Sequence, residues 1–321
     1  MSQYQIILKR TDELSDTDWT QYAAAFNKVF DKQFTEVYFK NKYLGTSLDY
    51  SYHGVLMHMS QIVGMFTVMP RQYIYGEKEI TIGLGCDAFI LKEHRRDEFF
   101  LKDMATIVTT AFKNEGVVFF ISIPNKAAYP YWKYYGGWKD IDKLDYYIVP
   151  LRVSKLLKKH YFLDVFSVLF FKTTISFFTF INFFSNICVK KRIHLKHYEE
   201  YFSQRYSSEY IIGKNNNDNS FVYRIYNEDN IRTAYLIDCF PLSPRNIAQS
   251  INKIIKETKS KIDVVLFVGK IDNPPFFFIK VPEKNEPRVQ PFIGLSIDDS
   301  VNEDFFLIES WEISLANFDN R

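Results

Sequence analysis

The segment from Ile121 to Trp138 constrains the fold of this chain more than any other stretch. An apolar run leads into Pro124-Asn125, and a short aromatic segment follows that closes on Gly136-Gly137. This order predicts a buried strand, a tight turn and a short helix that ends on glycine.

A second strand–turn–helix unit precedes it in the chain. The apolar run Cys86–Leu91 is followed by Glu93-His94-Arg95-Arg96 and then by a helical stripe over Phe99–Phe112. Alternating strands and helices predict an α/β fold, of the mixed-sheet α+β kind. The run Val117–Ile123 is apolar on both faces, which predicts a central strand.

The length of 321 residues favours two domains. A first domain is expected over residues 1–151, a segment of aromatic and basic linker helices over 152–197, and a second domain over 198–321. The elements restart after residue 198, and Val264–Val268 is the expected central strand of the second sheet.

Charge and cysteine usage exclude several classes of function. Forty basic and 38 acidic residues give a net charge of +2, so no nucleic-acid partner is expected. The isolated Cys86, Cys188 and Cys239 indicate reduced, buried thiols and a cytoplasmic protein. No signal peptide is apparent at the N-terminus. His194 and His197 are expected to share a basic face without a carboxylate partner, and no metal site is expected.

The two strand–turn–helix units together resemble the cofactor half of GNAT-type N-acyltransferases. The closing segment from Asp304 to Asp319, which contains Trp311, resembles the end of double-GNAT proteins found with surface-polysaccharide genes. The resemblance implies two GNAT-like domains, the second degenerate because it has no recognisable pyrophosphate loop. It also implies a thioester donor, acetyl-CoA or another acyl-CoA.

The resemblance also assigns the residues that would bind the donor. In the family a bulged strand pairs with the thioester arm, which here implies the backbone of Phe89, Ile90 and Leu91. A strand-to-helix turn holds the pyrophosphate, which implies Arg95 and Arg96, and the strand-ending Asn125 completes the set.

Candidate catalytic residues flank the same strand. Asp87 precedes it and Glu93 follows it, and either carboxylate is a candidate base for the proton of an amine. The family places a proton-donating tyrosine where this chain has Trp132. Tyr131, Tyr134 and Tyr135 are neighbours that can donate in its place, and we take Tyr134 as the candidate acid.

These assignments predict an acyltransferase that modifies an amine, such as an amino sugar, in cell-surface polysaccharide biosynthesis. One alternative is a catalytically silent, membrane-associated binding or scaffold protein of GNAT fold, because Glu98 and Phe100 occupy the two glycine positions of the pyrophosphate turn. Another is a FemAB-like aminoacyl transferase, which would use aminoacyl-tRNA as the donor.

The phenylalanine-rich segment Phe162–Val189 is the remaining unusual feature. Basic residues flank it at Lys158-Lys159 and at Lys190-Lys191-Arg192. A spanning helix, a helix lying on an anionic membrane surface and a packed inter-domain helix are all compatible with this pattern. The interfacial alternative predicts a peripheral protein on the inner face of the cell membrane.

Overall fold

The computed structural model describes residues 4–44, 48–95, 99–157, 162–181, 193–198, 200–215, 219–259, 261–298 and 301–318. The chain divides into two compact units whose segments alternate along the sequence. The first unit comprises Met1–Asp142, Arg192–Arg205 and Gln290–Trp311. The second comprises Lys143–Lys191, Tyr206–Val289 and Glu312–Arg321.

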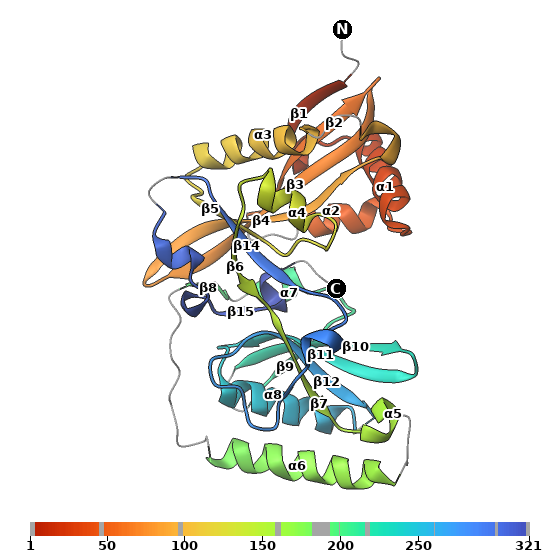
Figure 1. The fold of residues 1–321 in the computed structure, drawn as a ribbon, viewed down its shortest axis with the longest axis vertical. Coiled ribbons are helices and arrows are strands. Elements are labelled where there is room, and N and C mark those ends of the chain that lie inside the picture. The colour runs from red at the N-terminus through yellow and green to blue at the C-terminus, as the bar shows by residue number, and fades with distance from the viewer. Residues whose placement is uncertain are drawn as a thin grey trace. The chain divides into compact units, whose positions relative to one another are not determined.

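The first unit is a mixed eight-stranded sheet with helices on both faces (Figure 1). Its strands, in the order β1-β2-β3-β4-β5-β14-β6 with β8 beside β3, are β1 (Tyr4–Arg10), β2 (Tyr52–His58), β3 (Gln61–Tyr75), β4 (Lys78–Ile90), β5 (Phe119–Ser122), β14 (Pro291–Ser296), β6 (Lys139–Lys143) and β8 (Ile193–Leu195). Its helices are α1 (Asp16–Phe30), α2 (Glu36–Leu44), α3 (Phe100–Asn114), α4 (Tyr129–Tyr134) and α7 (Tyr201–Arg205). Strands β4 and β5 run parallel, whereas the pairs β1–β2, β2–β3, β3–β4, β3–β8 and β5–β14 run antiparallel.

Alternating side chains of β4 divide between the two faces of this sheet. Phe89 packs against Tyr22 and Phe26 of α1, whereas Ile90 belongs to the core that contains Met104 of α3. Helices α1 and α2 therefore cover one face, and α3 covers the other.

The second unit is a mixed seven-stranded sheet. Its strands, in the order β13-β7-β12-β11-β10-β9 with β15 beside β12, are β13 (Ile279–Lys280), β7 (Asp145–Pro150), β12 (Val264–Lys270), β11 (Ile231–Phe240), β10 (Ser220–Glu228), β9 (Ile211–Lys214) and β15 (Ile313–Ser314). Its helices are α5 (Val153–Leu157), α6 (Leu163–Ile181) and α8 (Pro244–Glu257), and α6 packs against α8. Strands β11 and β12 run parallel, like β4 and β5 in the first unit.

The two mixed sheets confirm the predicted fold class, and both expected central strands lie inside their sheets. Strand β5 lies between β4 and β14, and β12 lies between β7 and β11. The units differ from the continuous ranges expected from the sequence, because β14 comes from the last part of the chain and pairs with β5. Cys239 is buried as expected, Cys86 is only half-buried, and Cys188 lies outside the described residues.

Candidate functional site

The site begins where β4 and β5 part. The two strands pair only at Gly83–Phe120 and Leu84–Ile121, although β4 continues to Ile90. At the point of divergence the hydroxyl of Ser122 donates a hydrogen bond of 2.9 Å to the carbonyl oxygen of Gly85. In the described part of the chain, β5 therefore leaves the later half of β4 without a strand partner on this side.

A β-bulge interrupts β4 just beyond this point. Asp87 and Ala88 lie opposite the single residue Phe66 of β3, because the pairing register shifts between Met65 and Thr67. Asp87 adopts a φ of 45°, in the left-handed region, which aspartate tolerates better than most residues. The bulge redirects the backbone and fixes where the Asp87 side chain points.

The Asp87 carboxylate lies at the end of a buried polar chain from α1 and α2. It accepts hydrogen bonds from Lys42, at 2.5 Å, and from the hydroxyl of Tyr43. Since Tyr43 has one proton and gives it to the carboxylate, the Tyr22 hydroxyl must donate to Tyr43 in turn. Burial raises the pKa of both phenols well above their usual value, and the nearby Asp87 charge adds to the rise. Sequence analysis identified Asp87 but missed these three partners.

His53 lies beside this chain, with its ring 4.9 Å from that of Tyr43 in an edge-to-face arrangement. Its two nitrogens bond the hydroxyls of Thr11 and Thr67, at 3.1 and 2.9 Å. Complete burial lowers the His53 pKa from 6.5 to about 3, which makes the folded state hold a neutral imidazole.

This buried histidine predicts a loss of stability in mild acid. The unfolded chain takes up a proton below pH about 6.5 and the folded chain does not, so stability is complete above that pH and falls towards pH about 3. One such group removes about 1.4 kcal/mol per pH unit, or about 2 kcal/mol between pH 6.5 and pH 5. Denaturant unfolding of the wild type and His53→Gln across this range should show a shallower decline in the variant. Equal slopes in the two proteins would contradict the assignment.

The other predicted base, Glu93, is placed differently. It lies in the short helix Lys92–His94 after β4, is partly exposed, and pairs with Lys28 of α1 at 2.5 Å. The hydrogen bond from Lys28 lowers the Glu93 pKa. Both carboxylates are therefore paired with a lysine, and they differ in position and exposure: Asp87 lies in the bulge with its side chain 13% exposed, whereas Glu93 lies beyond the strand with its side chain 47% exposed.

The residues expected to hold the donor are partly engaged within the chain. Arg95 donates through Nε to the carbonyl oxygen of Ile90, at 2.8 Å, and Arg96 lies outside the described residues. The side chain of Asn125 accepts hydrogen bonds from the N–H groups of Ala127 and Ala128, so it closes the turn that precedes α4. Phe89 and Ile90 are buried, whereas Leu91 is half-buried.

The aromatic residues of α4 take different positions. Tyr134 is 76% exposed, whereas the hydroxyl of Tyr131 accepts a hydrogen bond from the N–H of Lys102 in the first turn of α3. Trp132 is buried against Phe66 and Trp138, so the residue at the family's acid position belongs to the core. Of the tyrosines considered from the sequence, Tyr131 is the one that reaches the start of α3.

One buried hydrogen-bond donor lies beside the point where β4 and β5 part. The ring of Trp138 lies against Gly85, 3.2 Å from the position that a β-carbon would take there. Its indole N–H is buried and has no acceptor among the described residues. A buried N–H without a partner is unfavourable by about 1–3 kcal/mol, and an amide or thioester carbonyl of a bound arm would supply the acceptor.

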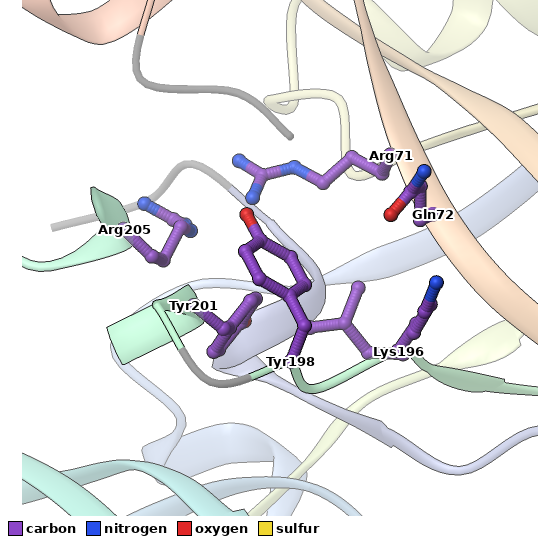
Figure 2. A pocket seen from close by; sticks show the side chains of 7 residues that line it. Arg71, Gln72, Lys196, Tyr198, Tyr201 and Arg205 are labelled. Atoms are coloured by element: carbon purple, nitrogen blue, oxygen red, sulfur yellow. The ribbon is translucent and has the colours of Figure 1, made fainter. Parts of the chain in front are cut away.

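A separate pocket in the first unit lies between β3, β8 and α7 (Figure 2). Its volume of about 20 Å³ admits roughly one water molecule, which is too small for a coenzyme. Arg71, Lys196 and Arg205 give it a basic lining, and Figure 2 shows Arg71 directed towards the hydroxyl end of Tyr198. Burial raises the Tyr198 pKa while the Arg71 charge opposes that rise. Sequence analysis did not identify this pocket, whose residues come from distant parts of the chain.

In the second unit the chain itself fills the place that corresponds to the site. Strands β11 and β12 pair in parallel up to Leu236–Phe267, and β15 then pairs with the end of β12 at Gly269 and Lys270. The hydroxyl of Ser314 in β15 donates to the carbonyl oxygen of Ile237, at 3.4 Å. Among the described residues, β15 thus occupies the gap between the ends of β11 and β12, in agreement with the degenerate second domain expected from the sequence.

Comparison with known structures identifies the architecture. A GCN5-related N-acetyltransferase from Anabaena variabilis matches with a TM-score of 0.58 and 12% identity, over 91% of this chain and 73% of its own. One from Kribbella flavida matches with a TM-score of 0.59 and 10% identity, over 91% and 71%. Eis1 from Mycobacterium abscessus matches with a TM-score of 0.56 and 10% identity, over 92% and 74%.

This chain has the GNAT fold. The match extends over both units, which is consistent with two GNAT-like domains. No protein-family model and no curated protein sequence matches the chain. The likeness at 9–12% identity therefore concerns the fold, and the activity is argued from the site.

Proposed function

We propose that the first unit is an N-acyltransferase that moves an acyl group from acyl-CoA to an amine. The observation that carries the proposal is the bulge of β4 at Asp87, placed just beyond the point where β4 and β5 part. The solved GNAT-fold proteins named above include N-acetyltransferases, which supports a transferase of this general kind.

The two substrates would meet at the bulge from opposite faces of the sheet. Ala88 and Trp138 lie on the face covered by α3, where the donor arm is expected. The Asp87 carboxylate is bound by Lys42 and Tyr43 of α2, on the other face. An amine that approaches from the α2 face would therefore present its proton to Asp87.

The residues of the chain would divide the chemistry between them. A backbone N–H of the bulged strand would polarise the thioester carbonyl, and Asp87 would take the proton of the attacking amine. Lys42 and Tyr43 would hold the carboxylate in place. Tyr131 would be the nearest phenol to the start of α3 that can protonate the departing thiolate. When bound, the donor supplies an activated acyl group and a thiolate leaving group.

The acceptor we propose is an amino sugar or a related amine used in cell-surface polysaccharide. This choice rests on the resemblance of the closing segment around Trp311 to proteins associated with surface polysaccharides. A panel of amino-sugar nucleotides and simple amines, followed by thiol release from acetyl-CoA, would test it.

A catalytically silent GNAT-fold module is the second candidate. Its support is that Trp132 is buried in the core and that Arg95 and the first turn of α3 already bond to groups of the chain. Absence of both acetyl-CoA binding and thiol release on every acceptor tested would favour this candidate.

Binding of the donor can be tested through Arg95. Calorimetry with acetyl-CoA should give measurable binding, and Arg95→Ala should weaken it about tenfold, as expected for loss of one charge-assisted contact. Lys126→Ala is a matched control, since Lys126 is an exposed cation beside Asn125. Absence of binding in the wild type would refute the donor assignment.

A further inference from the structure

Helix α6 has two apolar faces, and only one of them is covered. Phe171 and Ile175 are buried in the core of the second unit, and Phe178 packs against Phe277 at 5.4 Å between ring centres. The carboxylate of Asp164 is directed towards α5, where it accepts hydrogen bonds from the N–H and hydroxyl of Ser154. These contacts hold α6 on its own unit.

The opposite face is apolar and open to solvent. Seven large side chains are between 59 and 71% exposed, and they recur at helical spacing: Phe162, Val165, Phe166, Leu169, Phe170, Phe177 and Phe180. The stripe runs for about 27 Å at the rise of an α-helix. The exposed Thr173 adds little polarity, because its hydroxyl donates to the carbonyl oxygens of Leu169 and Phe170. An exposed apolar surface of this extent is typical of an interaction site.

Charge around the stripe favours an anionic partner. Lys172 is exposed beside it, and the sequence places Lys158-Lys159 before the helix and Lys190-Lys191-Arg192 after it. From Arg152 to Arg192 the chain has eight Lys and Arg residues and one acidic residue, Asp164. The whole chain, by contrast, carries a net charge of only +2.

We propose that the exposed face of α6 docks on the surface of an anionic lipid bilayer. A bilayer surface offers both an apolar layer for the phenylalanine rings and anionic headgroups for the basic flanks. A second copy of this chain would instead bring two sets of basic flanks to one interface, which is unfavourable.

The helix lies along the membrane and does not cross it. Residues Leu163–Phe180 are long and apolar enough for a spanning helix by length and composition. Spanning would, however, remove Phe171 and Ile175 from the core of the second unit and would place Asp164 and Lys172 in lipid. Docking by the exposed face leaves all of these contacts intact.

The test is co-sedimentation of the full chain with vesicles of phosphatidylcholine alone and of phosphatidylcholine mixed with phosphatidylglycerol. We expect binding to the mixed vesicles, weaker binding at high salt and little binding to the neutral vesicles. Phe166→Glu and Leu169→Glu should each lower the partition coefficient at least tenfold. Val289→Glu is the matched control, because Val289 is 62% exposed in the same unit and should change nothing.

The flanks can be tested separately. Changing Lys190, Lys191 and Arg192 to Gln should lower binding about fivefold for each lost charge, or roughly a hundredfold together. Each variant should remain folded, because the apolar side chains that are changed are exposed. Thermal unfolding of each variant checks this.

Several results would overturn the proposal. They are failure to bind the anionic vesicles, binding that the Phe166 and Leu169 variants leave unchanged, and retention that only detergent reverses, as for a spanning helix. Self-association in solution that Phe166→Glu abolishes, without vesicle binding, would assign the face to a second copy. None of these results bears on acyl transfer by the first unit.

Discussion

Replacing Trp311 with alanine is expected to lower the free energy of unfolding by about 3–5 kcal/mol. Trp311 is 1% exposed, and its ring packs among those of Tyr73, Phe119 and Phe292 in the first unit. Its indole N–H donates to the carbonyl oxygen of Phe305, at 3.0 Å. Truncation would leave a large cavity among four segments of the chain and a buried carbonyl without its donor.

Guanidinium unfolding, followed by far-ultraviolet circular dichroism, measures this loss. Leu307→Ala is the control, because Leu307 comes from the same segment but is 50% exposed, and its replacement should change stability by about 0.5 kcal/mol or less. A Trp311→Ala protein as stable as this control would contradict the burial of Trp311 in the core of the first unit.

Replacing Asp87 with asparagine is expected to lower the rate of acyl transfer about 10²- to 10⁴-fold, the usual range for removal of a general base. Asparagine also tolerates the left-handed conformation found at this position, so the bulge should persist. Its amide oxygen can still accept the hydrogen bond from Tyr43. The affinity for acetyl-CoA should therefore stay the same while the rate falls.

Glu93→Gln is the matched variant for this experiment. Glu93 is the other carboxylate next to the strand and is also paired with a lysine, but it lies outside the bulge and its side chain is 47% exposed. We expect thiol-release rates within a few-fold of the wild type for this variant. Full activity of Asp87→Asn, or an equal loss in both variants, would remove Asp87 from the role of base.

The sequence predicted the elements of the fold well because they depend on local patterns. The apolar runs at Val117–Ile123 and Val264–Val268 become central strands, as continuous burial requires. Sequence analysis could not predict that β14 would complete the first sheet, because pairing between residues far apart leaves no periodic signal. This pairing is one reason why the segments of the two units alternate along the sequence.

Prediction of the candidate site from the sequence meets the same limit. Asp87 was identified as a candidate base because it adjoins the strand that resembles the bulged strand of GNAT proteins. Its partners Lys42 and Tyr43 come from a helix more than 40 residues earlier in the chain. Tyr43 looked like one of many aromatic core residues, and it is indeed buried. Its hydroxyl acquires a role only when the fold brings it to the bulge.

The late position of β14 has a consequence for synthesis. The ribosome releases the chain from its N-terminus, and domains usually fold in that order. Here the first sheet lacks a strand until residues 291–296 have emerged, and its core lacks Trp311 until later still. The second sheet waits for β15 at residues 313–314. Both sheets thus keep open edges until about residue 314 has been made, and a nascent chain of this protein has more need of protection by chaperones than one whose domains are continuous.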